Sequence, residues 1–130
     1  MSAADEASTY ALLNTGRELL EEGKFRRAVR VLERARKSEP RKGSILEPLG
    51  RAYYLGRDYR KAYRCFKQAL EIDPTNDYAH YCMGLCCLKL DRHEKAGGHF
   101  KMAWSLKPCE IYREKAFRFG APGEDGGPAG

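Results

Sequence analysis

The chain has 130 residues, of which 42% are hydrophobic and 32% are charged, and this suits one compact domain rather than two. Its formal net charge of +6 favours an acidic partner but carries no information about the fold. No apolar run approaches the roughly 20 residues that a transmembrane helix needs. Neither a membrane span nor a signal peptide is therefore expected, and a membrane is not expected as a partner.

The five cysteines are an odd number, and Cys82, Cys86 and Cys87 crowd one predicted helix. Disulfides that staple a small secreted domain usually join distant segments, which this spacing does not suit. We therefore expect reduced thiols that pack as small apolar core residues. The expected location is the cytoplasm, with the nucleus as the alternative.

A period of 34 residues organises the chain from its first third to its last. Such a period predicts a repeat architecture before any local pattern is considered. Small residues recur where two helices must approach closely, a large apolar residue fills the space beside them, and proline closes each unit. The sets are Gly16, Gly50 and Gly84; Ala28, Ala62 and Ala96; Ala35, Ala69 and Ala103; Leu32, Phe66 and Phe100; and Pro40, Pro74 and Pro108.

Each repeat is predicted to be a hairpin of two helices. The first spans residues 9–42 and turns at residues 22–24, where Glu-Gly-Lys interrupts the apolar pattern. The second spans residues 43–76 and turns at residues 56–58, which read Gly-Arg-Asp. The third spans residues 77–110. The sequence thus predicts an all-α protein.

The start of the second repeat carries a specific helix signal. Ser44 and Glu47 have the spacing of a capping box, in which each side chain accepts a hydrogen bond from a free backbone N–H group. A helix start near Ser44 is therefore predicted, with Pro48 in the first turn, where a missing N–H group costs least.

The chain is predicted to end in a seventh helix and a tail. Residues 111–119 place Ile111, Ala116 and Phe119 near one face and charges elsewhere, which suits a cap over the last repeat. Residues 120–130 hold five glycines and two prolines but no large apolar residue, so a disordered tail is predicted.

The second repeat closely resembles the tetratricopeptide repeat (TPR) family. The third repeat departs from the pattern, with Cys87 where tyrosine is usual and His80 where tryptophan is common. The resemblance implies three antiparallel helix pairs stacked into a right-handed α-solenoid with a concave groove. The residues that carry it are Leu49, Gly50, Tyr53, Ala62, Phe66, Ala69 and Pro74.

The resemblance also implies that the first helix of each repeat lines the groove, where such proteins bind peptide or helical segments of other proteins. Arginine and tyrosine are typical of binding hot spots, and Arg17 and Arg51 are 34 residues apart. Some of the tyrosines could instead pack between repeats. The implied lining is Tyr10, Asn14, Arg17, Glu47, Arg51, Tyr54, Tyr78, Tyr81, Cys82, Leu85 and Lys89.

One subtype of the family grips the C-terminal carboxylate of chaperones with lysine, asparagine and arginine side chains. At the matching positions this chain has Leu13, Arg17, Pro48, Tyr78 and Cys82, so only Arg17 keeps a charge. Binding of a chaperone tail by this carboxylate clamp is therefore not expected.

A second surface comes from the basic run between residues 24 and 42. The run holds nine lysines and arginines against Glu33 and Glu39. Its cations recur at helical spacing opposite Ala28 and Leu32, which predicts a stripe on the outer, convex face. The stripe is either a solvated face or, as the alternative function, a footprint for nucleic acid, although it lacks aromatic residues that would stack on bases. Its members are Arg26, Arg27, Arg30, Arg34 and Lys37.

The sequence contains no constellation that predicts catalysis. It has no nucleophile with a neighbouring base and no glycine-rich phosphate loop, because Gly97 and Gly98 lie inside a predicted helix. Two cysteines one turn apart, Cys82 and Cys86, with His80 make only a weak metal pattern. We therefore expect a protein-binding adaptor or scaffold that is not an enzyme and has no cofactor or metal.

Overall fold

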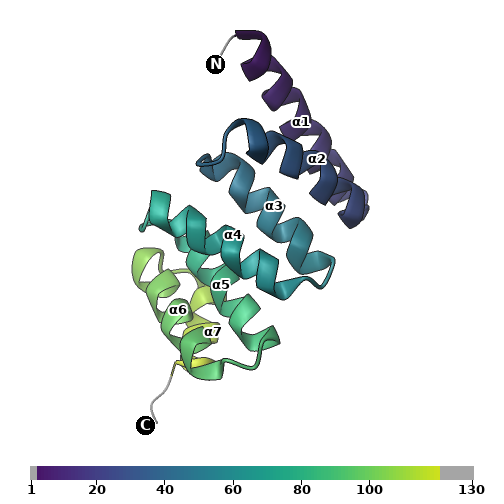
Figure 1. The fold of residues 1–130 in the computed structure, drawn as a ribbon. Coiled ribbons are helices and arrows are strands. Elements are labelled where there is room, and N and C mark those ends of the chain that lie inside the picture. Colours follow the sequence, from purple (N-terminus) through teal and green to yellow (C-terminus); the bar gives the residue numbers. More distant parts are fainter. Residues whose placement is uncertain (1–2, 121–130) are drawn as a thin grey trace. The chain divides into compact units, whose positions relative to one another are not determined.

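The computed structural model describes residues 3–120, and within them all regular secondary structure is α-helical (Figure 1). The predicted all-α fold, with three helical hairpins and a seventh helix, is confirmed. The predicted tail falls outside the described residues except for Gly120. The helices are α1 (Ala3–Glu21), α2 (Phe25–Ser38), α3 (Gly43–Leu55), α4 (Tyr59–Ile72), α5 (Asp77–Lys89), α6 (His93–Leu106) and α7 (Glu110–Phe119).

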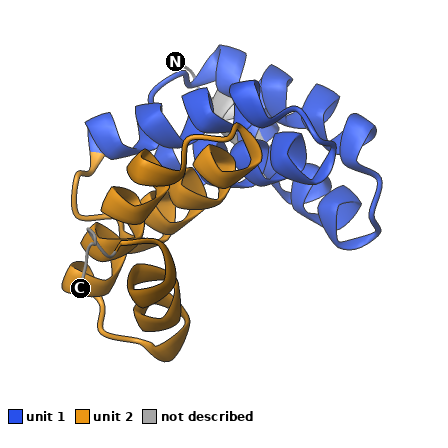
Figure 2. Cartoon of the chain, turned by 90° about the horizontal axis from the view of Figure 1, so that it is seen from below, with its two compact units in different colours: residues 1–72 blue, residues 73–130 orange. Residues whose placement is uncertain are grey.

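The chain divides into two compact units, residues 1–72 and residues 73–130 (Figure 2). In the first unit α2 packs against both α1 and α3, α3 packs against α4, and α1 also contacts α3. In the second unit α6 packs against both α5 and α7. No helix in the described part of the chain is long and apolar enough to cross a bilayer.

The three hairpins share one turn geometry, although their turn sequences differ. The middle residue of each turn has a left-handed backbone: φ is 77° at Gly23, 69° at Arg57 and 63° at Asp91. Each turn ends in a backbone hydrogen bond from an N–H group to the carbonyl five residues earlier. This is the pattern of a Schellman motif, which satisfies free carbonyls at the end of a helix. These bonds run from the Lys24 N–H to Leu19 O (2.8 Å), from the Asp58 N–H to Tyr53 O (2.8 Å) and from the Arg92 N–H to Cys87 O (2.7 Å).

The predicted capping box at the start of α3 is wrong. The helix begins at Gly43, and the residue before it that caps the helix is Lys42, whose carbonyl accepts from the N–H groups of Ile45 and Leu46. Ser44 therefore lies inside the first turn instead of before it. Pro48 is the sixth residue of the helix, buried in the second turn and not in the first as predicted.

The recurring glycines make room for a large side chain of the partner helix, as predicted. A Cβ atom added to Gly16 would lie 2.4 Å from Leu32, one added to Gly50 would lie 2.7 Å from Phe66, and one on Gly84 would lie 2.4 Å from Phe100. The three large residues are completely or almost completely buried. Each hairpin therefore locks through one glycine and one large apolar side chain.

Helix α7 packs through Ala116 and Phe119, as predicted, but with Tyr112 in place of Ile111. Its buried residues are Tyr112 and Ala116, and the ring centroid of Phe119 lies 5.7 Å from that of Phe100. These residues are spaced by four and three positions, so they share one helix face. Ile111 lies off this face and is 60% exposed, so its predicted place in the cap was wrong.

The cysteines pack as the sequence predicts. All five are free thiols, and Cys65, Cys82, Cys86 and Cys87 are buried, while Cys109 is partly exposed. The three cysteines of α5 lie among Ala79 and other small core residues of the same helix, where they act as apolar groups.

Candidate functional site

The residues predicted to bind a partner in the first unit lie on α1 and α3. On each helix the three candidates are spaced by four and three residues, which places them on one face. The buried residues Leu13 and Gly16 are offset by one position, so they face the core while the candidates do not. We call these six residues the first-helix surface: Tyr10 (65% exposed), Arg17 and Arg51 (exposed), and Asn14, Glu47 and Tyr54 (half-buried).

Arg17 and Arg51 are the two uncommitted cations of the first-helix surface. They follow Gly16 and Gly50, the glycines that hold their helices against Leu32 and Phe66. Among the described residues, neither guanidinium has a hydrogen bond or an ion pair. Both are thus exposed on helices that contact one another, with their donors available to a ligand.

The candidates on α5 belong to the second unit and are less accessible than predicted. The ring of Tyr81 packs 5.1 Å from that of Tyr112 and 5.9 Å from that of Phe100, so it mainly joins three helices. Burial raises the pKa of Tyr81. Of the others, Tyr78 and Leu85 are half-buried, Lys89 is exposed and Cys82 is buried.

Cys82 does not fit the partner-binding role that the sequence assigned to it. Only 5% of the residue is exposed. It lies on the face of α5 that also holds the buried Ala79, Met83 and Cys86, at spacings of one helical turn. Its thiol is therefore part of the core rather than of a contact surface.

The five residues of the predicted basic stripe on α2 are all exposed. Their helix buries Ala28, Leu32 and Ala35 on the opposite side, as the periodicity indicates. Arg36, which the stripe did not include, behaves differently because it is half-buried and bound by an acid.

That acid, Glu33, forms a partly buried network that the sequence reasoning missed. The Arg36 guanidinium donates from Nε (2.9 Å) and Nη2 (2.7 Å) to Glu33 Oε1, and the Tyr53 hydroxyl donates to Glu33 Oε2. Burial, followed by the Glu33 hydrogen bond, raises the pKa of Tyr53. The pKa of Arg36 is also raised, because Glu33 stabilises its charge. The only signal was that Glu33 is the single acid of α2.

The second unit contains a pair of histidines that the sequence reasoning also missed. His80 Nδ1 lies 3.4 Å from His99 Nδ1, and His80 Nε2 lies 3.2 Å from the carbonyl of Pro74. A carbonyl can only accept, so when both rings are neutral His80 carries its proton on Nε2 and its Nδ1 accepts from the Nδ1–H of His99. Burial, then the charges of His80 and Lys95, lower the pKa of His99.

The lowered pKa of His99 predicts that acid destabilises the protein. Below the ordinary histidine pKa of about 6.5, the unfolded chain binds a proton that native His99 resists, so acidification favours unfolding. Between pH 7.5 and 5.5, urea unfolding should show a larger loss of stability for the native chain than for His99→Gln. The difference should be a fraction of the roughly 1.4 kcal/mol per pH unit that one proton contributes. Equal losses of stability in the two proteins would show that His99 does not contribute to the acid sensitivity.

The first-helix surface carries side-chain types that are common in protein-binding sites. Within the described residues there is no group of three or more histidines, cysteines and acids that could hold a metal ion. The surface holds the exposed guanidinium groups of Arg17 and Arg51 on the same helix faces as Tyr10 and Tyr54, and arginine and tyrosine are typical of binding hot spots.

The chain resembles parts of two much longer curated proteins. It is 39% identical to Protein STIP1 homolog of Dictyostelium discoideum over 59 residues, which are 45% of this chain and 10% of that protein. It is 27% identical to Superkiller complex protein 3 of Mus musculus over 105 residues, which are 81% of this chain and 7% of that protein. The chain therefore spans a tenth or less of the length of these relatives.

A solved structure has the same fold. The first TPR of Spaghetti (RPAP3), bound to the HSP90 peptide SRMEEVD, matches with a TM-score of 0.81 and 16% identity, over 86% of this chain and 89% of that chain. The likeness establishes the arrangement of the helices and nothing about a ligand of this chain.

The repeat pattern also agrees with a family model. The model described as anaphase-promoting complex, cyclosome, subunit 3 matches residues 21–103, which is more than half of the chain. This match covers the helices from α2 to most of α6. It agrees with the 34-residue period of the sequence and with the helical hairpins of the structure. The chain belongs to this family of tetratricopeptide repeat proteins.

Proposed function

We propose that this chain is a non-enzymatic adaptor module that binds an acidic segment of another protein on the first-helix surface of residues 1–72. Arg17 and Arg51 would each pair with a carboxylate of the segment, and Tyr10 would add a broad contact with a polar tip. The observation that carries the proposal is that both guanidinium groups are exposed on two contacting helices and have no partner among the residues that the structure describes.

The physical chemistry of these side chains supports the proposal. A guanidinium presents several donors in a fixed plane, and charge-assisted hydrogen bonds are roughly twice as strong as neutral ones. The net charge of +6 attracts acidic segments from a distance. A peptide bound to the first TPR of Spaghetti shows that another domain of this fold takes short acidic sequences.

The mode of binding is proposed to differ from a carboxylate clamp. Leu13 is only 7% exposed, and Pro48 and Cys82 are buried, so three of the five clamp positions present no polar side chain to a terminal carboxylate. The peptide SRMEEVD is therefore a suitable negative control, and we expect no saturable binding of it.

The test is a double charge reversal on the first-helix surface. We expect Arg17→Glu with Arg51→Glu to weaken binding by about 100-fold or more, because each of the two lost charge-assisted bonds costs about 1.5 kcal/mol or more. Binding is measured by fluorescence anisotropy with the strongest peptide from an array of acidic and neutral 12-residue peptides.

The matched control reverses two charges on the basic stripe of the same unit, Arg26→Glu with Arg30→Glu. This variant has the same net charge, and it should bind within about threefold of the native affinity because it leaves the first-helix surface intact. Loss of binding in the control with retention in the first variant would overturn the proposal.

A nucleic-acid role is the second candidate, because all five side chains of the basic stripe are exposed. Phosphate contacts release counterions and give a steep dependence of affinity on salt. Binding of single-stranded RNA that weakens steeply with salt and fails in the control variant would favour this role over the first.

A further inference from the structure

A pocket of about 370 Å³ lies in the first unit, and none of its lining residues belongs to the first-helix surface. Helix α2 contributes Glu33 and Arg36 to its wall, and α3 contributes Tyr53. The other lining residues come from α4 and are Lys61, Arg64, Cys65 and Gln68. An adjoining pocket of about 450 Å³ shares Glu33 and Arg36 with it and adds Arg34, Lys37 and Pro40.

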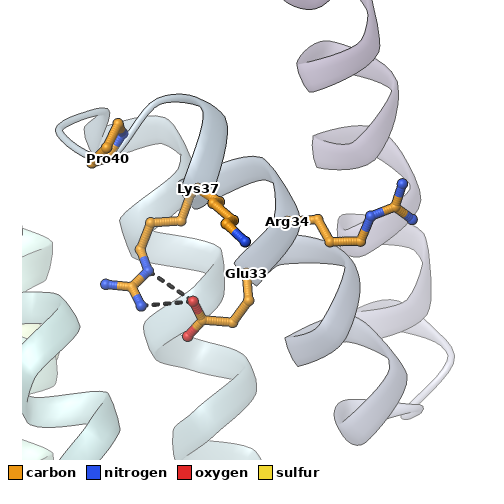
Figure 3. Close-up of a pocket in the computed structure, with 5 residues that line it drawn as sticks. Glu33, Arg34, Lys37 and Pro40 are labelled. Carbon is orange, nitrogen blue, oxygen red and sulfur yellow. Dashed lines mark hydrogen bonds and ion pairs between the residues drawn. The ribbon is translucent and has the colours of Figure 1, made fainter.

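Figure 3 shows the shared wall of these pockets. Arg36 donates two hydrogen bonds to the Glu33 carboxylate. Lys37 lies on the same side of the helix as Glu33. Arg34 extends in another direction, away from Glu33. The Glu33–Arg36 pair therefore forms a fixed wall between the two pockets.

The only negative charge in the 370 Å³ pocket is already compensated. Both carboxylate oxygens of Glu33 are taken, one by Arg36 and the other by Tyr53. Burial raises the pKa of the Cys65 thiol to about 12, so this residue stays neutral at physiological pH. Tyr53 likewise remains a neutral donor.

The cations of α4 are not compensated in the same way. The Lys61 ammonium lies 5.7 Å from the centroid of the Tyr53 ring, which neutralises no charge. Among the described residues Arg64 has no ion pair. Together with Arg36 the lining has three cations and one carboxylate, which leaves a net charge of +2 facing the cavity.

We propose that this pocket, which we call the anion pocket, binds the phosphoryl group of a phosphorylated protein segment between Arg36, Lys61 and Arg64. A phosphoryl group carries a charge of about −1.5 to −2 at pH 7, which matches the lining, whereas a single carboxylate would leave one cation unmatched. Arg36 is held in place by Glu33 before the ligand arrives, so less side-chain entropy is lost on binding.

The anion pocket favours a phosphorylated peptide over nucleic acid. Nucleic acids bind grooves that combine cations with exposed aromatic faces for the bases. The aromatic residue here, Tyr53, is buried, and its ring carries Lys61. The proposal is independent of the first-helix surface, because the two share no residue.

The test compares phosphorylated and unphosphorylated peptides on the intact chain. The probe is a degenerate library of 12-residue peptides with one fixed phosphoserine, and its twin has serine at that place. We expect the phosphorylated library to bind at least about tenfold more tightly, because a dianion meets three cations at close range. Equal binding of the two libraries would overturn the proposal.

Two α4 variants with the same charge change localise the site. Lys61→Glu with Arg64→Glu should abolish the preference for phosphoserine, whereas Arg60→Glu with Lys67→Glu, exposed residues outside the pocket, should keep it. Circular dichroism checks that both variants remain helical. Equal loss in both variants would show that only the general positive field of the unit acts, and would overturn the anion pocket.

Two competitors separate the possible sources of phosphate. Inorganic phosphate should compete only at concentrations well above those of the phosphorylated peptides. If inorganic phosphate competes as well as the phosphorylated peptides do, the proposal that the pocket recognises a peptide is overturned. If a single-stranded oligouridine binds more tightly than the peptides and depends on Lys61 and Arg64, the site is a nucleic-acid site instead.

Discussion

Removal of residues 110–130 is expected to unfold the second unit, whereas removal of residues 121–130 should leave its stability unchanged. Helix α7 covers the α5–α6 hairpin with aromatic side chains: Tyr112 packs on Tyr81, and Phe119 packs on Phe100. The Tyr112 hydroxyl also donates to Asp77 Oδ2 at 2.8 Å. Fully burying one large apolar side chain contributes about 1.5–3 kcal/mol. Tyr112 is buried and Phe119 is half-buried, so the loss of both removes a large part of the roughly 5 kcal/mol that a marginally stable domain has.

The measurement is urea denaturation followed by circular dichroism on the intact chain and the two truncations. The longer truncation should lose helical signal before any urea is added and should aggregate, because the face of Phe100 becomes exposed. The shorter truncation keeps Gly120, whose N–H donates to the carbonyl of Ala116 at the end of α7. Identical unfolding curves for the two truncations would mean that α7 does not stabilise the unit.

The architecture could be predicted because its determinants repeat in the sequence. Each glycine that is two helical turns from its hairpin turn has a large apolar residue sixteen positions later, and these pairs are in contact in all three hairpins. A 34-residue period predicts such contacts from the sequence alone, because the same residues at the same positions of each repeat produce the same helix crossing.

Helix ends were predicted less well, because they depend on single hydrogen bonds. Ser44 and Glu47 have the right spacing for a capping box, yet the carbonyl of Lys42 begins α3. A serine near a helix end can bond in several ways, and the sequence does not reveal which backbone groups the rest of the protein leaves free. The same limit applies to Pro48, which the buried surroundings of α3 tolerate one turn later than predicted.

In the candidate site, too, features within one helix could be predicted, whereas contacts between helices could not. The exposed face of α2 was predicted from helical spacing, and those of α1 and α3 from the resemblance to the TPR family. The Tyr53 bond to Glu33 joins residues 20 apart, and the His80 contact with His99 joins residues 19 apart. Neither separation along the sequence is a multiple of the 34-residue repeat or of a helical turn. Only the tertiary structure therefore shows that these residues are in contact.

Substitution of two adjacent glycines of α6 is expected to have opposite effects, Gly97→Ala strongly destabilising and Gly98→Ala stabilising. A Cβ atom on Gly97 would lie 2.1 Å from the carbonyl oxygen of Phe119 and 2.9 Å from the Cα atom of Gly120. These are backbone atoms at the end of α7, so they cannot swing aside as a side chain could. Gly98 has nothing within 4 Å of its Cβ position and is exposed.

The expected size of each effect follows from this difference in surroundings. Overpacking typically costs about 1–3 kcal/mol, and Gly97→Ala should reach the upper end because α7 must shift as a whole. Gly98→Ala should increase the free energy of unfolding by about 0.5–1 kcal/mol, since alanine restricts the unfolded chain and favours the helix. Urea unfolding of both variants measures the two values. Because the substitutions are chemically identical and one residue apart, similar free energies of unfolding would rule out the close approach of α6 to the end of α7.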